Sequence, residues 1–158
     1  MSCALANIFR ELNAINKMLK HIRKVVFVRH GESVWNKSNR FTGWHDVPLS
    51  SAGIQESLDA GHKIKMSKIL IDNVFTSNLK RTICCFDKIA DVLDIHSIPV
   101  IKTYRLNERH YGALEGLNKA EMITKYGEAQ VKLWTRSFNV RPPPLCDVNL
   151  GSPLTEVW

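Results

Sequence analysis

The sequence predicts an α/β fold in which helices flank a mostly parallel sheet, arranged as a three-layer sandwich. Three short runs rich in β-branched and aromatic residues, at 25–28, 73–77 and 98–101, are typical of buried strands. Segments with the apolar spacing of amphipathic helices separate these runs, at 51–66 and 78–93. Strands that alternate with helices in this order are typical of a layered α/β domain.

The first predicted strand leads directly into Arg29, His30, Gly31 and Glu32, a run with charged and nucleophilic side chains. Ligands of open α/β sheets bind at the carboxyl ends of strands, so this junction is the first candidate site. Residues 33–44 follow with neither a helical nor a strand period, and we expect a long functional loop there. The alternative for His30 is an ordinary polar residue at the start of a loop.

Cap residues mark where the predicted helices begin and end. One of the serines at 50 and 51 is expected to cap a helix that opens within residues 49–53 and runs to about Met66. Asn118 with Glu121 three residues later resembles a capping box, and Gly127 stands where that helix should end.

The remaining elements complete the predicted order. Pro99 places the third strand near an edge of the sheet. Residues 105–117 are dense in charge and glycine and are predicted to form a second site loop. A last helix is expected over 128–138, ended by the prolines at 142–144.

Composition narrows the class of partner. The 158 residues suffice for one domain with a core, and 22 Lys and Arg against 15 Asp and Glu give a net charge of +7. The basic residues are spread along the chain without a helix-turn-helix, RNA-binding or zinc-finger pattern, and no apolar stretch approaches a membrane span. We therefore expect phosphorylated small molecules as partners, with no nucleic acid and no membrane.

The four cysteines match neither a metal site nor a disulfide framework. Reduced thiols in a cytoplasmic protein are the simplest account, with one of the adjacent Cys84 and Cys85 packed as a small apolar residue. The basic, amphipathic residues 1–24 could direct the chain to mitochondria, but their few serines favour an ordinary extension. We predict an extension over 1–23, a catalytic domain over 24–145 and an irregular tail over 146–158.

The candidate chemistry is phosphoryl transfer to His30. A neutral imidazole can attack phosphorus, and Arg29 and Arg81 beside it would disfavour the imidazolium and bind phosphoryl oxygens. Arg81 is expected in the first turn of a helix, where anions bind, although a solvated surface arginine is the competing interpretation.

Three further residues are candidates for handling the rest of a substrate. Glu108 lies in a basic loop, either as a salt-bridge partner or as a proton donor and acceptor for a substrate hydroxyl. Lys119 and Arg136 are candidate clamps for a carboxylate or a second phosphate.

Together these residues resemble the 2,3-bisphosphoglycerate-dependent phosphoglycerate mutases of the histidine phosphatase superfamily. The resemblance covers residues 26–144. Arg-His-Gly-Glu at 29–32 fits the whole superfamily, whereas Leu-Asn-Glu-Arg-His-Tyr-Gly at 106–112 is more specific to the mutase branch.

The resemblance implies that His30 is the phosphorylated nucleophile and Glu108 the acid/base in the interconversion of 3-phosphoglycerate and 2-phosphoglycerate. It implies 2,3-bisphosphoglycerate as the priming donor and no metal, and it leaves a homodimer open. The residues implied to hold phosphates and the glycerate carboxylate are Arg29, Asn36, Thr42, Gly43, Arg81, Tyr111, Lys119 and Arg136.

The chain departs from the family in three places. A second histidine, in a His-Gly-Asn motif, is absent after residue 145; Thr135 replaces the first of two arginines; and residues 1–22 have no counterpart. We therefore expect a fold that is incomplete at its C-terminal end, whose first strand exposes apolar surface and unpaired backbone groups.

Two alternatives to an active mutase stay open. One is an impaired remnant or splice form that binds phosphate ligands or pairs with a full-length subunit. The other is a basic module for nucleic acid or membrane surfaces.

Overall fold

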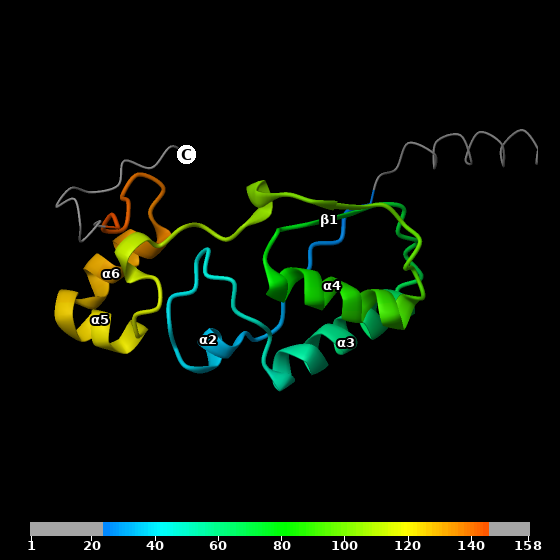
Figure 1. Ribbon diagram of the computed structural model, residues 1–158, viewed down its shortest axis with the longest axis horizontal. Helices are drawn as coiled ribbons and strands as arrows, with labels where there is room; N and C mark the ends of the chain where they lie inside the picture. The colour runs from blue at the N-terminus through cyan, green and yellow to red at the C-terminus, as the bar shows by residue number, and fades with distance from the viewer. Residues whose placement is uncertain (1–23, 146–158) are drawn as a thin grey trace, which may run out of the picture.

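The computed structural model describes residues 24–145. One end of the molecule holds a small sheet with two long helices, and the other end holds two shorter helices (Figure 1). Extended segments and loops join the two ends. The elements are α2 (Val34–Lys37), α3 (Ser51–Met66), β1 (Val74–Thr76), α4 (Lys80–Leu93), β2 (Val100–Lys102), the 3-10 helices η1 (Tyr104–Leu106) and η2 (Gly112–Leu114), α5 (Lys119–Tyr126) and α6 (Glu128–Arg136).

The sheet confirms the predicted parallel arrangement for two of the three strands. β1 pairs with β2 in parallel, with Phe75 opposite Ile101 in the register. Helix α4 connects the two strands, as a parallel pair requires. The second strand begins at Val100, two residues later than predicted, and Pro99 contributes only its carbonyl, which accepts from the amide of Val74 at 3.0 Å.

Helices α3 and α4 pack against each other through a close approach at Gly61. A Cβ added to Gly61 would lie 2.9 Å from the side chain of Val92, so only glycine allows this spacing. Leu49, Cys85 and Ile89 form the buried core beside it. Cys85 is thus the cysteine that packs as a small apolar residue, as predicted.

A second core holds α5 and α6 to the loop that follows α2. Phe41, Leu114, Met122 and Val131 are its buried members. Asn118 caps α5 as predicted, with its Oδ1 accepting from two backbone amides of the first turn. The turn from α5 into α6 passes through a glycine with a φ of +81°, where a side chain would be strained.

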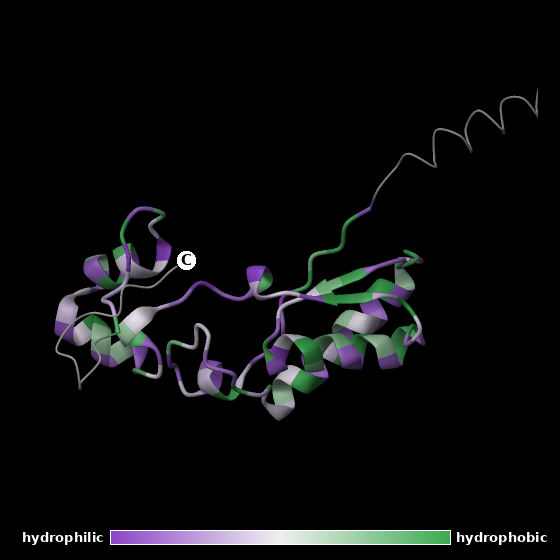
Figure 2. Ribbon diagram, turned by 45° about the horizontal axis from the view of Figure 1, so that its top comes forward, coloured by the Kyte–Doolittle hydropathy of each residue, from purple (hydrophilic) through white to green (hydrophobic). Residues whose placement is uncertain are grey.

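The predicted first strand is wrong. Residues 24–30 are extended but belong to no strand, and the only sheet in the described chain contains β1 and β2. Phe27 is 93% exposed and Val25 71% exposed, and the apolar segment stands out in Figure 2. An apolar run indicates a need for burial, but no described element covers this one. The exposed apolar surface that was expected at residues 25–28 is therefore present.

Three boundaries also differ from the predictions. The loop over 33–44 contains the one-turn helix α2, which Ser33 and Asn36 cap reciprocally. The helix predicted from 78 begins at Lys80, because residues 77–79 form the turn out of β1. The last helix ends at Arg136 rather than at 138. The predictions for 1–23 and 146–158 lie outside the described residues.

The parallel pair of β1 and β2 with its connecting helix α4 confirms the predicted α/β class.

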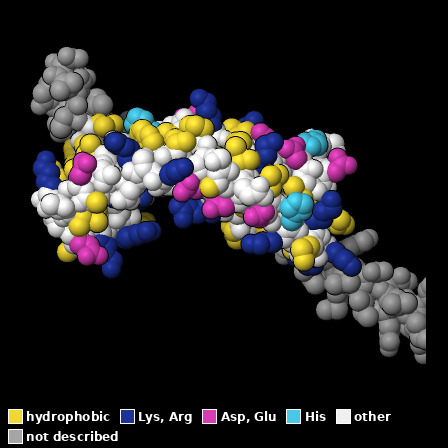
Figure 3. All heavy atoms as spheres, turned by 90° about the horizontal axis from the view of Figure 1, so that it is seen from below, with side chains coloured by type: hydrophobic (Ala, Val, Ile, Leu, Met, Phe, Trp, Pro, Cys, Tyr) yellow, Lys and Arg dark blue, Asp and Glu magenta, His cyan; other side chains and the backbone are white. Residues whose placement is uncertain are grey.

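Basic side chains are scattered over the face seen in Figure 3 rather than gathered in one patch. None of the helices between residues 24 and 145 is both long and apolar enough to cross a membrane.

Candidate active site

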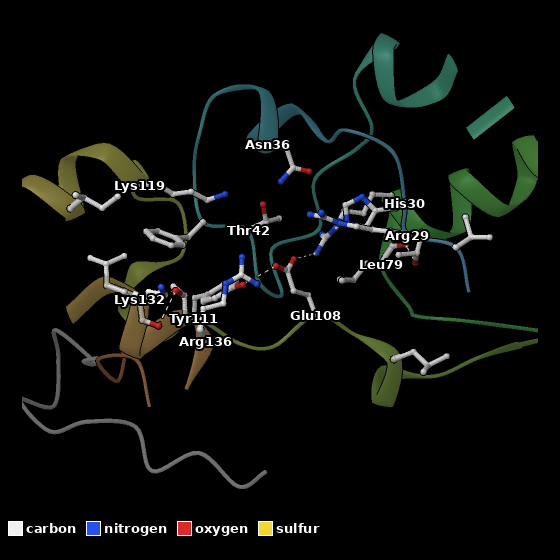
Figure 4. A pocket seen from close by; sticks show the side chains of 18 of the residues that line it. Arg29, His30, Asn36, Thr42, Leu79, Glu108, Tyr111, Lys119, Lys132 and Arg136 are labelled. Carbon is white, nitrogen blue, oxygen red and sulfur yellow. Dashed lines mark hydrogen bonds and ion pairs between the residues drawn. The ribbon is translucent and has the colours of Figure 1, made fainter. Parts of the chain in front are cut away.

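A cavity of about 870 Å³ separates the two ends of the molecule and brings the predicted site residues together. Its walls come from the segment that ends at His30, the loop around Thr42, the start of α4, the loop between η1 and η2, and helices α5 and α6. Gly43 is the one predicted residue that does not line it. The predicted residues that line it are Arg29, His30, Asn36, Thr42, Arg81, Glu108, Tyr111, Lys119 and Arg136 (Figure 4).

A glycine–glycine contact fixes the position of His30. A Cβ added to Gly31 would lie 2.2 Å from the carbonyl oxygen of Gly53, in the first turn of α3. The backbone of Glu32 also accepts from the amide of Ser50 at 2.9 Å. The start of α3 therefore holds the backbone that directly follows the histidine.

His30 points its unprotonated ring nitrogen, Nε2, toward Arg81 at the edge of the cavity. Its Nδ1 lies 2.7 Å from the carbonyl oxygen of Gly31, and because a carbonyl can only accept, Nδ1 carries the proton. The Nε2 atom accepts from Nε of Arg81 at 3.2 Å. Burial lowers the pKa of His30, and the charges of Arg81 and Arg29 lower it further, against the opposing effects of the Gly31 hydrogen bond and Glu108. The imidazole is thus held in its neutral, nucleophilic form.

Arg81 is fully buried and organises the site. Its two terminal nitrogens donate to the carbonyl oxygens of His45 at 2.9 Å and Gly43 at 2.8 Å. One of them also forms an ion pair with Glu108 at 3.1 Å. The guanidinium of Arg81 thus connects the loop before α3 to the carboxylate of Glu108 and to the imidazole of His30. The surface-arginine interpretation is wrong.

Gly43 acts through its backbone. Its φ of +56° is a conformation that favours glycine, and its carbonyl receives the Arg81 bond. A Cβ at this position would overlap the carboxylate of Glu115. Gly43 therefore shapes the loop that holds Arg81, and does not line the cavity itself.

Glu108 lies between Arg81 and Tyr111, with its side chain 35% exposed. The hydroxyl of Tyr111 donates to Oε1 of Glu108 at 3.1 Å. Burial raises the pKa of Tyr111 to about 12, and the negative charge of Glu108 acts in the same direction. Tyr111 therefore remains a hydrogen-bond donor over the physiological range, and Glu108 is oriented from both sides.

Two smaller polar residues offer hydrogen bonds to a ligand. The Thr42 hydroxyl is buried without a hydrogen-bond partner in the described chain, although it lines the cavity. A buried hydroxyl without a partner is costly, so its position indicates a ligand atom. Asn36 uses its Oδ1 to accept from the backbone and hydroxyl of Ser33. The amide of Asn36 has donors left for an anion.

Lys119 and Arg136 complete the far wall. Lys119 lies in the first turn of α5, with its ammonium 5.8 Å from the centre of the Phe41 ring. Arg136 is the last residue of α6. Neither forms an ion pair with a carboxylate between residues 24 and 145, so both charges are available to an anion.

Sequence analysis missed two residues. Glu115 is a buried carboxylate that accepts from the backbone amides of Trp44 and Tyr111, at 3.1 and 3.0 Å, and lies 3.3 Å from Nδ1 of His110. No sequence pattern distinguishes it from other acidic loop residues. Lys132 also lines the cavity, one helical turn before Arg136, and this spacing was a usable signal.

Within residues 24–145, no three His, Cys, Asp or Glu side chains are grouped so as to hold a metal ion. The anion-binding groups of the cavity are instead cations, hydroxyls and amides.

Comparison with known proteins places this geometry in a family. The model of the histidine phosphatase superfamily (branch 1) matches residues 25–157. The chain belongs to this superfamily. Curated relatives named 2,3-bisphosphoglycerate-dependent phosphoglycerate mutase include one from Buchnera aphidicola subsp. Schizaphis graminum, 58% identical over 122 residues, covering 77% of this chain and 53% of the relative. One from Porphyromonas gingivalis is 48% identical over 135 residues, covering 85% and 54%.

The fold of this member of the superfamily has counterparts among solved structures. A phosphoglycerate mutase from Bacillus anthracis aligns with a TM-score of 0.60 at 24% identity, covering 69% of this chain and 49% of that one. This likeness concerns the fold alone. The chain spans about half the length of the curated relatives it matches.

Proposed function

We propose that this chain carries the phosphoryl-transfer site of a phosphoglycerate mutase that interconverts 3-phosphoglycerate and 2-phosphoglycerate. The observation that carries the proposal is the contact of a neutral His30 Nε2 with Arg81, which in turn holds Glu108. A nucleophile, a cation for the transferring phosphoryl group and a carboxylate for proton transfer thus lie together. The names of the relatives support the substrate.

In the proposed reaction, His30 Nε2 exchanges its hydrogen bond from Arg81 for a bond to phosphorus, while Nδ1 keeps its proton and donates it to the carbonyl oxygen of Gly31. The nitrogen–phosphorus bond forms as the phosphorus–oxygen bond to the glycerate breaks, and Glu108 gives a proton to the departing oxygen. In the return step Glu108 takes the proton of the free hydroxyl of a bound phosphoglycerate, and the oxygen of that hydroxyl attacks the phosphoryl group on His30 as the nitrogen–phosphorus bond breaks. Arg81 and Arg29 neutralise the negative charge on the phosphoryl oxygens throughout.

The cavity fits 2,3-bisphosphoglycerate as the priming donor. Within residues 24–145 the Thr42 hydroxyl has no hydrogen-bond partner and Lys119 and Arg136 form no ion pair, which suits a ligand with several anionic groups. When bound, 2,3-bisphosphoglycerate supplies the phosphoryl group that first loads His30. Arg29, Asn36, Tyr111 and the backbone near Gly43 would complete the binding of phosphates and carboxylate.

A coupled mutase assay on the purified chain, with and without 2,3-bisphosphoglycerate, tests this function. We expect turnover that needs the bisphosphate, disappears in His30→Ala and persists in His62→Ala, a matched change at an exposed histidine of α3. A folded chain that binds 3-phosphoglycerate without turnover would refute the mutase proposal and favour a phosphate-binding remnant.

A further inference from the structure

The cavity carries two separate groups of positive side chains. One group surrounds His30, and the other lies beyond Glu108, on the side formed by α5 and α6 (Figure 4). The members of the far group are Lys119, Lys132 and Arg136. Among these, Lys132 has no role in the reaction described above.

One face of α6 turns toward the cavity. Val131 is buried against the second core and fixes the rotation of the helix, so that positions 128, 131, 132, 135 and 136 all line the cavity. Of the polar groups on this face, the hydroxyl of Thr135 donates within the helix, to the carbonyl of Val131 at 2.8 Å. The two cations of the face are therefore the groups with donors left for a ligand.

Lys132 and Arg136 are four residues apart, which makes them neighbours on the helix surface. Like charges at this spacing destabilise a helix unless an anion lies between them. Glu128 is one turn before Lys132 and also lines the cavity, but it forms no ion pair with either cation in the described chain. An anionic ligand would relieve this repulsion.

We propose that Lys132 is a specificity-determining residue that, together with Arg136, binds the anionic group of the ligand farthest from His30. The pair would select phosphate esters that carry a second anion, a carboxylate or a phosphate, over phosphate esters without one. This inference rests on the proposed function for the place of the first phosphate, near His30.

Calorimetric titration of the full chain tests the selection without requiring turnover. The ligands are 3-phosphoglycerate, 2,3-bisphosphoglycerate, glycerol 3-phosphate, which lacks the carboxylate, and inorganic phosphate. We expect Lys132→Gln to weaken the binding of 3-phosphoglycerate and 2,3-bisphosphoglycerate by about threefold to tenfold, as for the loss of a partly exposed ion pair. The binding of glycerol 3-phosphate and inorganic phosphate should weaken by less than about twofold. Lys132→Arg should keep the preference.

The control is Lys125→Gln, an exposed lysine of α5 outside the cavity, which should change none of the four affinities. Equal weakening of all four ligands by Lys132→Gln, or no weakening of any, would overturn the proposal. A parent chain that binds 3-phosphoglycerate no more tightly than glycerol 3-phosphate would overturn it as well. Because binding is measured, these outcomes are distinct from a failure of mutase turnover.

Discussion

Replacing Arg81 tests how strongly its guanidinium stabilises the loop that contains Gly43 and His45 and the position of Glu108. Arg81→Met keeps a long side chain but removes the guanidinium. The carbonyls of Gly43 and His45 then lose their charged donor, at about 1 kcal/mol each. The ion pair with Glu108, whose side chain is 35% exposed, contributes about 1 kcal/mol more. The free energy of unfolding should therefore fall by about 3 kcal/mol.

Urea denaturation followed by tryptophan fluorescence and circular dichroism measures this loss. The matched control is Lys80→Met, because Lys80 is the neighbouring residue and its ion pair with Asp46, at 3.6 Å, is largely exposed. That variant should lose less than about 1 kcal/mol. An Arg81→Met variant within about 1 kcal/mol of Lys80→Met, with the same denaturant slope, would refute the reasoning.

If Arg81→Met fails to fold, the conservative variant Arg81→Lys still allows the loss of stability to be measured. Lysine retains the charge but cannot place donors on two carbonyls and a carboxylate at once. We expect it to lose about half as much, between about 1 and 2 kcal/mol. Stability equal to that of the parent chain would show that the forked geometry of Arg81 contributes nothing.

Two other predictions concern His30 and its support. Gly31→Ala would place a methyl group 2.2 Å from the Gly53 carbonyl oxygen, and the resulting shift should cost about 1–3 kcal/mol; an unchanged melting temperature would contradict this close contact. The lowered pKa of His30 predicts that the acid-side decline of kcat/KM has its midpoint below pH 6.5, since the neutral imidazole is the nucleophile. Below pH 6.5 the unfolded histidine binds a proton that the folded one does not, so stability should fall as the pH drops toward the folded pKa. This part of the pH dependence of stability should disappear in His30→Gln and remain in His62→Gln, and a parent chain whose stability does not fall below pH 6.5 would contradict it.

Local signals predicted the helices well. Ser50, Asn118 and Gly127 act on the backbone within a few residues, so their effects can be recognised from short patterns. The helix α2 carried the same kind of signal, because Ser33 and Asn36 have the spacing of a capping pair. Its four residues were too few to show a hydrophobic period.

Contacts between distant segments could not be predicted in the same way. The position of Arg81 in a first turn followed from the sequence, but its bonds to the carbonyls of Gly43 and His45 depend on a loop conformation that Glu115 holds from 70 or more residues away. Residues 25–28 show the opposite case. Their apolar composition indicates burial, but burial depends on a partner surface, and no described element provides one.

The most direct test of the central claim is to locate the phosphate. The purified chain is incubated with 2,3-bisphosphoglycerate, and the phosphorylated residue is mapped by mass spectrometry under alkaline conditions, which preserve phosphohistidine. The account predicts one acid-labile phosphate, on His30, that is absent from His30→Gln. A folded chain that binds the bisphosphate but carries no phosphate on His30, or carries it on another histidine, would contradict the account.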